Sequence, residues 1–480
     1  ELALSSESGA TPPTRRVEAG RLPLTPAQAG FVFLEESQRR EAPIWFADVP
    51  VHGEVDPERF RNALAEVIRR HPMLRAVFRR EGAQWFQQVL PPCDPPLFIH
   101  DAPLDQQELQ EVWADVRATR FELSQLPLFR VVLVRSATGP WRLMLAVHHI
   151  IGDAWSLHVV IEDLASALAG EELPALDASW SEVVAWHART DPHRQASKDY
   201  WRGFFSRAPS PVRWAPSQGE ELEGTLVRTV DRTTTARLRE IARARATTLH
   251  ACVLTVWFQS LRSELGEDDL TTGTASGGRE IPVPDVERMV GCLATTLPVR
   301  AKVSGDFDTD LRAVSMAWEE AWQHGDVPVY ESWLAAGAPH GSQAPGLDLY
   351  FSFMEFGSLA ARRDAPLRFD LSSAELHFST DSAGHRAMLT VLVDDAIRLQ
   401  LRGDGSADRL RALAERMARG LEQLAGRTRA GDAVRSVKDD AAIVAYLPSL
   451  AGLTGALDSG AAAHRLRERV LPGLFPRGGA

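Results

Sequence analysis

The pattern of hydrophobic and polar positions predicts strands that alternate with helices. An unbroken apolar run over residues 143–147 is typical of a strand covered on both faces, and residues 129–134 predict a second strand that pairs with it. From Trp155 to Leu168, apolar side chains recur close to the helical period. We expect Asp153 to cap this helix, because its carboxylate can accept hydrogen bonds from the exposed N–H groups of the first turn.

Further amphipathic segments lie on both sides of this stretch. Thr25 and Pro26 suit the cap and first turn of one helix. Asp56 suits the cap of a second helix, in which Phe60 and Val67 lie on the same face. Other helices are predicted over residues 108–120, 236–245, 248–265 and 406–425, and a strand over residues 269–274.

Composition then limits the class of protein. Of the 480 residues, 44% are hydrophobic and 24% are charged, as in a globular protein of two large domains or lobes. A formal net charge of −11 argues against a nucleic-acid partner, and no apolar run is long enough to span a bilayer. Three widely spaced cysteines form neither a disulfide framework nor a zinc pattern, so we expect unpaired thiols in a reducing cytoplasm: Cys93, Cys252 and Cys292.

Both ends and one internal segment lack periodicity. Residues 1–20 are rich in Ser, Gly, Thr and Pro and predict a linker or disordered arm. Residues 207–223 predict a linker between lobes. Residues 437–480 form an unassigned extension, in which residues 443–453 allow a short helix. The chain begins with Glu1, which leaves open whether it is a piece of a longer polypeptide.

Two adjacent histidines, His148 and His149, follow the apolar strand. Successive side chains of a strand point to opposite sides, so one imidazole is expected in the interior and the other toward a cleft. Two rings on opposite sides cannot easily converge on one metal ion. The pair therefore suits a single general base with a supporting neighbour.

At this point the sequence resembles a known family. His148, His149, Asp153 and Ala154 resemble the His-His-three-Asp-Gly motif of nonribosomal peptide synthetase condensation domains, part of which is shared with the wider chloramphenicol-acetyltransferase-like superfamily. Ala154 stands where the family usually has glycine, which permits close backbone approach. The string Arg70-His-Pro-Met-Leu-Arg75-Ala-Val-Phe resembles a second motif of the family at all five of its defined positions.

Further motifs follow in the family's order, so the resemblance runs from about Leu22 to Gly426. Four positions depart from the usual residues: Gly30 replaces Arg, Ala294 and Thr295 replace Val and Asn, and Gly325 replaces Gln. The other segments that carry the resemblance are Ala27-Gln28, residues 180–186, Tyr200-Trp201, residues 290–300, residues 324–328 and Asp370-Leu371.

The resemblance implies an α/β (α+β) fold of two chloramphenicol-acetyltransferase-like lobes, residues 21–186 and 187–436, in a V-shaped pseudo-dimer with the active site between them. It implies His149 as the base or as the hydrogen-bond acceptor that orients an amine, with His148 structural. It further implies that Asp153 shapes the loop through an ion pair with Arg279, and that Arg75 is structural and within reach of that loop. Backbone N–H groups near Ala154 are candidates for stabilising an oxyanion.

The implied reaction joins an acyl or peptidyl thioester, carried on the phosphopantetheine arm of a donor peptidyl carrier protein, to an amine that is usually bound to an acceptor carrier. Neighbouring synthetase domains of the same chain are further possible partners. No cofactor bound directly, no metal, no nucleic acid and no membrane are implied, and the cytoplasm is the expected location. The chain has neither a Gly-x-Ser-x-Gly elbow nor a phosphate loop of the Gly-four-Gly-Lys type.

Other interpretations stay open. A free-standing acyltransferase would form an ester or amide with a soluble acceptor, and a catalytically silent domain would only recruit a carrier protein. An epimerisation domain fits residues 296–300 less well, and a cyclisation domain would have aspartate in place of His148. Without the other motifs, His149 would be read as an ordinary loop histidine.

Overall fold

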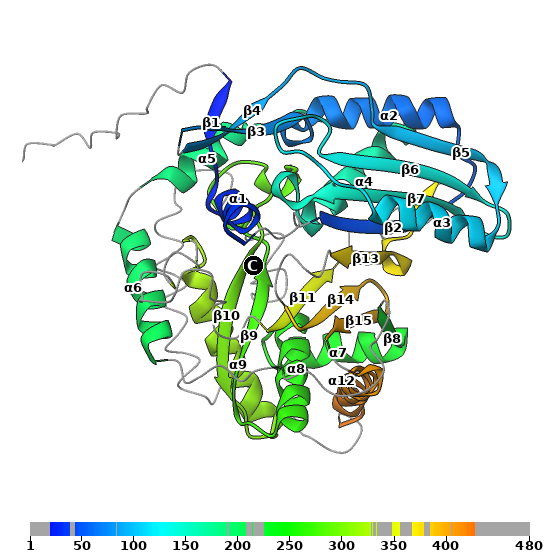
Figure 1. Cartoon of the computed structure of the whole chain (residues 1–480). Helices are drawn as coiled ribbons and strands as arrows, with labels where there is room; N and C mark the ends of the chain where they lie inside the picture. The colour runs from blue at the N-terminus through cyan, green and yellow to red at the C-terminus, as the bar shows by residue number, and fades with distance from the viewer. Residues whose placement is uncertain are drawn as a thin grey trace, which may run out of the picture.

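The computed structural model describes residues 20–38, 44–82, 84–189, 192–207, 214, 225–327, 329, 333, 348–355, 367–378, 385–404 and 406–427. Within these residues the chain builds two large mixed sheets, one in each half, and a small third sheet. Figure 1 shows the first half, in blue to cyan, in the upper part of the view and the second half, in green to orange, below it. The predicted linker 207–223 and the extension 437–480 lie almost wholly outside the described residues.

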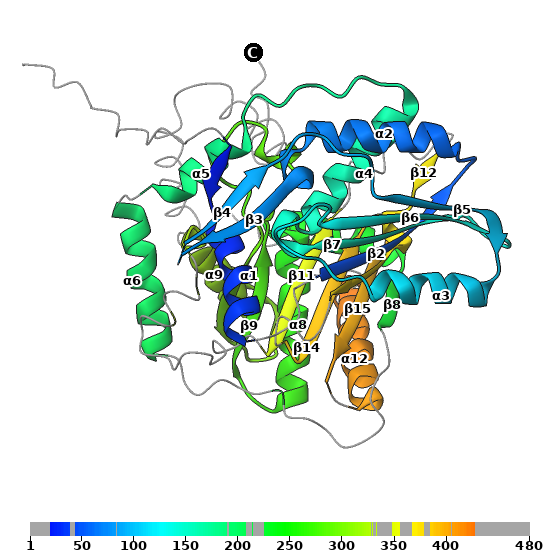
Figure 2. The ribbon, with the colours of Figure 1, turned by 45° about the horizontal axis from the view of Figure 1, so that its top comes forward.

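The sheet of the first half is covered on both faces, as the apolar run over residues 143–147 predicts. Alternate residues of strand β2 point to opposite sides, so Trp45 packs with helices α2 and α4 while Phe46 packs with Trp113 of α3. Figure 2 shows α2 and α3 on opposite sides of these strands. The elements are β2 (Ile44–His52), β5 (Leu97–Leu104), β6 (Phe129–Ser136), β7 (Trp141–His148), α2 (Pro57–Arg70), α3 (Gln106–Arg117) and α4 (Ala154–Ala169).

The small sheet lies at the edge of the first half. It has the antiparallel order β1-β4-β3, and Arg75, at the end of a 3₁₀ turn, leads into β3. Helix α1 begins at Pro26, as its cap predicts. The elements are β1 (Arg21–Pro23), β3 (Ala76–Glu81), β4 (Gln84–Val89), α1 (Pro26–Gln38) and α5 (Trp180–Ala188).

The second half is a six-stranded sheet with its helices packed into one core. Trp201 of helix α6 belongs to this core, together with Trp257 of α8 and Leu421 of α12, and all three side chains are fully buried. The sheet order is β10-β9-β11-β14-β15-β8. The elements are β8 (Leu226–Val230), β9 (Asp269–Ser276), β10 (Thr295–Lys302), β11 (Leu349–Glu355), β14 (Ala387–Val393), β15 (Ile397–Gly403), α6 (Pro192–Arg207), α7 (Arg232–Ala244), α8 (Leu249–Leu265), α9 (Phe307–Gln323) and α12 (Ala407–Arg427).

One segment of the second half joins the sheet of the first. Strands β12 (Arg368–Phe369) and β13 (Glu375–Phe378) both pair antiparallel with β2, and Figure 1 shows β13 in yellow below the blue β2. The side chains of Arg398 and Gln400 donate to the Ala374 carbonyl at 3.3 and 3.0 Å. A division into residues 21–186 and 187–436 therefore needs a correction, because residues 368–378 complete the sheet of the first half.

The predicted elements are present with small shifts of their ends. Strand β6 pairs antiparallel with β7, as expected. Helix α3 spans Gln106–Arg117 and not residues 108–120, and its earlier start follows from the capping box that Asp105 forms with Glu108. Helix α7 begins four residues before the predicted start, because Asp231 accepts a hydrogen bond from Thr234 N.

Candidate active site at the seam between the two halves

The two histidines at the end of β7 have the different fates that the sequence predicts. His148 is fully buried, and its Nδ1 accepts a hydrogen bond from Ile150 N at 3.1 Å. This bond closes the short 3₁₀ turn His149–Ile151. His149 is only partly buried, so His148 supports the loop while His149 keeps an accessible part.

The ring of His149 contacts two side chains from distant parts of the chain. The ring of Phe31 in α1 is 4.7 Å away, centroid to centroid, and Cys292 Sγ is 3.6 Å from Nδ1. Desolvation lowers the pKa of His149 from its usual value, and the charge of Asp153 offsets this only in part. The imidazole is therefore neutral at pH 7 and able to accept a proton.

Asp153 is the centre of a buried hydrogen-bond network. Its carboxylate caps α4 by accepting from Ser156 N at 2.9 Å, and it also accepts from the backbone N–H groups of Leu293 and Ala294 at 3.1 and 3.0 Å. Arg279 donates to both carboxylate oxygens, at 2.8 and 3.0 Å. This confirms the predicted Asp153–Arg279 pair, in its bidentate form.

The electrostatics of this pair follow from its burial. Desolvation by itself would raise the pKa of Asp153, but the Arg279 charge and the hydrogen bonds to the carboxylate lower it to about 2. Asp153 is fully buried, and its hydrogen bonds join the start of α4 to Arg279 and to the backbone of Leu293.

Glycine residues allow the two halves to approach closely here. The Gly291 carbonyl accepts from Arg279 at 3.1 Å and from Ser156 Oγ at 3.0 Å. A Cβ on Gly291 would lie 2.1 Å from the ring of Trp180. Glycine at position 291 is therefore required by contact with the aromatic residue that opens α5.

Two further predicted site residues, Arg75 and Ala154, differ in their surroundings. Arg75 donates to the carbonyls of Ile68, Arg69 and Leu90 at 3.1, 3.3 and 2.6 Å. It thus holds the end of α2 against the strand edge, and none of these bonds goes to the histidine loop that it was expected to reach. Ala154 is the first residue of α4, a helical position that alanine adopts readily.

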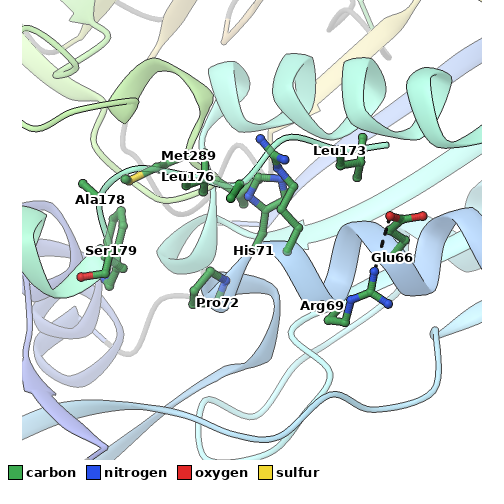
Figure 3. A pocket seen from close by; sticks show the side chains of 13 residues that line it. Glu66, Arg69, His71, Pro72, Leu173, Leu176, Ala178, Ser179 and Met289 are labelled. Atoms are coloured by element: carbon green, nitrogen blue, oxygen red, sulfur yellow. Dashed lines mark ion pairs between the residues drawn. The ribbon is translucent and has the colours of Figure 1, made fainter. Parts of the chain in front are cut away.

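A second buried cluster, at the end of α2, was not predicted from the sequence. Asp163 of α4 lies 2.7 Å from His71 Nε2 and 2.9 Å from Arg70 Nε. A cavity of about 400 Å³ adjoins these residues, with Leu173 and Met289 on its wall, and Figure 3 shows His71 among the side chains that line it. Neither His149 nor Cys292 belongs to this lining, so the cavity is separate from the surroundings of His149.

No helix in the described part of the chain is long and apolar enough to cross a bilayer. The same residues contain no group of three or more His, Cys, Asp or Glu side chains that could hold a metal ion.

Comparison with known proteins decides the family. A family model described as the condensation domain matches residues 18–378. The chain belongs to the condensation domain family. The match starts in the predicted arm and ends with strand β13, so it includes every residue of the Asp153 network.

Relatives among curated proteins are large synthases. The condensation domain is 31% identical over 310 residues to one of the linear gramicidin synthase proteins of Brevibacillus parabrevis, which is 59% of this chain and 4% of that protein. It is 28% identical over 289 residues to tyrocidine synthase 3 of the same organism, which is 58% of this chain and 4% of that protein. The chain thus spans only a small part of the relatives that it matches.

Solved structures show the same fold. The condensation domain of the monacolin K polyketide synthase MokA superposes with a TM-score of 0.71 at 17% identity, covering 85% of this chain and 97% of that one. The first condensation domain of the calcium-dependent antibiotic synthetase gives 0.69 at 19% identity, with 85% and 96% covered. The predicted α/β fold is therefore confirmed, and it is the fold of these condensation domains.

Proposed function

We propose that this domain forms an amide bond between a carrier-bound acyl or peptidyl thioester and an acceptor amine. The observation that carries the proposal is the position of His149. It is neutral, partly accessible, and held in a loop that the Asp153–Arg279 pair fixes to the second half. Membership of the condensation domain family supports the same reaction.

In the proposed reaction the amine nitrogen attacks the thioester carbonyl carbon and the C–S bond breaks. The nitrogen loses a proton, and the leaving thiolate of the phosphopantetheine arm gains one. His149 Nε2 accepts the proton from the amine, or orients the amine by accepting its hydrogen bond. A positioned base typically accelerates a reaction by about 10²–10⁴-fold, and alignment of two reactants contributes roughly 7–11 kcal/mol.

The other residues of the site hold the loop that carries His149. His148 and Asp153 hold the backbone around His149, and Arg279 holds Asp153. Since Ser156 N already donates to Asp153, the N–H groups of Ala154 and Trp155 are the ones left at the start of α4 for a developing oxyanion.

The partners in this proposal are a donor and an acceptor peptidyl carrier protein. Both substrates arrive on phosphopantetheine arms, so the domain needs no resident cofactor or metal. The matched relatives are synthases much longer than this chain, and we infer that the domain works beside other synthetase domains in the cytoplasm.

Intact-protein mass spectrometry tests the function. Acyl-loaded donor and aminoacyl-loaded acceptor carriers are incubated with wild type, His149→Ala, and the control His100→Ala, which changes an exposed histidine on β5. We expect condensed product on the acceptor carrier with wild type and the control, and none with His149→Ala.

Two other results would point elsewhere. Carrier binding without product from wild type would favour a silent recruitment domain. Product on a soluble amine or alcohol, but not on a carrier, would favour a free-standing acyltransferase.

A further inference from the structure

Cys292 is placed directly against the reactive histidine by a segment of the other half. Its side chain is fully buried, and Sγ lies 3.6 Å from His149 Nδ1. The two residues are far apart in sequence, and the motif that contains Cys292 predicts nothing about its side chain. The contact is therefore a feature of how the two halves meet.

The surroundings of this thiol argue against a covalent role. Burial raises the pKa of Cys292 well above its usual value, and the nearby Asp153 charge raises it further. The sulfur is thus a neutral thiol and not the thiolate that acts as a nucleophile. A neutral thiol sulfur can still accept a weak hydrogen bond from an imidazole N–H.

The backbone on both sides of Cys292 is fixed, so its sulfur has a defined position. Gly291 is bonded to Ser156 and Arg279, and Leu293 N donates to Asp153. Cys292 has no exposed surface into which it could rotate. A side chain held this firmly is suited to fix the orientation of the ring beside it.

The two nitrogens of His149 then have different roles. Cys292 Sγ faces Nδ1 at 3.6 Å. As an acceptor this sulfur favours a proton on Nδ1, and the partner of one ring nitrogen decides which tautomer is present. The other ionisable groups that act on the ring are Asp153 and His148 of its own loop.

We propose that Cys292 is a positioning residue for His149: its sulfur accepts from Nδ1–H and so keeps the Nε2 lone pair available to the substrate. The proposal rests on the proposed role of His149 in acyl transfer. It also makes the second half a direct contributor to the base, because the thiol leaves the ring if the two halves separate.

The test compares Cys292→Ala and Cys292→Ser with Cys252→Ala. Cys252 is the matched control, since it is equally buried but lies in the α8 core. Loss of the hydrogen-bond partner that orients a metal-bound histidine typically costs about 10–100-fold, and Cys292 stands in the same relation to the ring of His149. We expect Cys292→Ala to lower kcat by about 10-fold or more with little change in KM for either carrier. Cys292→Ser, which keeps an acceptor near Nδ1, and Cys252→Ala should stay near wild type.

A second readout does not depend on activity. In ¹⁵N-histidine-labelled protein, the signals that disappear in His149→Gln identify the ring of residue 149. We expect the Nδ1–H tautomer in wild type and Cys292→Ser, and a mixture of tautomers in Cys292→Ala. An unchanged tautomer in Cys292→Ala, with kcat equal to that of Cys252→Ala, would overturn the proposal. If wild type forms no product, the proposed function fails, yet the tautomer measurement still decides the role of Cys292.

Discussion

Replacing Arg279 by methionine tests its ion pair with Asp153, which joins the two halves of the chain. The substitution removes the guanidinium and keeps an unbranched side chain. The side chains of Arg279 and Asp153 are only 6% and 1% exposed, so water cannot replace the lost partner. Breaking a buried pair from one side typically costs about 3–5 kcal/mol, because the remaining charge stays buried. We expect the free energy of unfolding at pH 7 to fall by roughly this amount.

The pKa of Asp153 gives an independent magnitude and a pH dependence. Desolvation opposes ionisation, but Arg279 and the hydrogen bonds lower the pKa from 3.8 to about 2. The folded value lies below the unfolded one, so the carboxylate stabilises the fold by roughly 2 kcal/mol above about pH 4. This stability is lost as the pH falls toward 2. In Arg279→Met desolvation dominates and the pKa rises, so the stability difference from wild type should shrink between pH 7 and pH 4.

Urea unfolding of Arg279→Met and Arg300→Met measures both effects. Arg300 is the matched control, because it also binds an aspartate with two hydrogen bonds, at 2.8 and 2.7 Å, but its pair with Asp269 is 27% and 40% exposed. Exposed pairs contribute about 0.2–1 kcal/mol. Equal losses of unfolding free energy in the two variants would refute the reasoning. A stability difference between Arg279→Met and wild type that does not change with pH would refute it as well.

Three further changes test single contacts. Gly278→Ala should lower the urea midpoint strongly, because Gly278 has φ +65° and a Cβ would lie 2.0 Å from the Leu293 carbonyl oxygen. The control Gly277→Ala should leave the midpoint unchanged, because a Cβ there would have open space around it. Burial lowers the pKa of His250 to about 4, so wild type should lose roughly 3 kcal/mol as the pH falls from about 6.5 to 4. His250→Phe should lose less in thermal unfolding across that range, and an equal loss would contradict the assignment. Asp105→Ala should cost about 1 kcal/mol in urea, since it removes the capping box of α3, and no cost would argue against that cap.

Local signals explain why much of the fold could be predicted from the sequence. The apolar run 143–147 depends only on neighbouring residues, and it forms a strand buried on both faces. The caps at Asp56 and Asp153 likewise act within one turn of the chain, and both are present. The pair of Asp153 with Arg279 was predicted from the family resemblance, because its two partners are far apart in sequence.

Contacts between distant segments were not predictable in the same way. The pairing of residues 368–378 with β2 leaves no sign in either segment, since a short strand can pair with any free edge. The cluster of His71 with Asp163 depends on how α2 packs against α4. The contact of Cys292 with His149 depends on the approach of the two halves.

Backbone hydrogen bonds between the two halves also explain why this chain can depart from the usual residues of its motifs. Asp153 is bound by the backbone N–H groups of Leu293 and Ala294, and the Gly291 carbonyl binds Arg279. A backbone donor is kept whatever the side chain, so alanine at position 294 leaves the bond to Asp153 unchanged. The positions that cannot vary are those whose side chain or missing Cβ makes the contact, such as Arg279 and Gly291. It follows that the network around His149 requires far fewer specific side chains than the length of its motifs suggests.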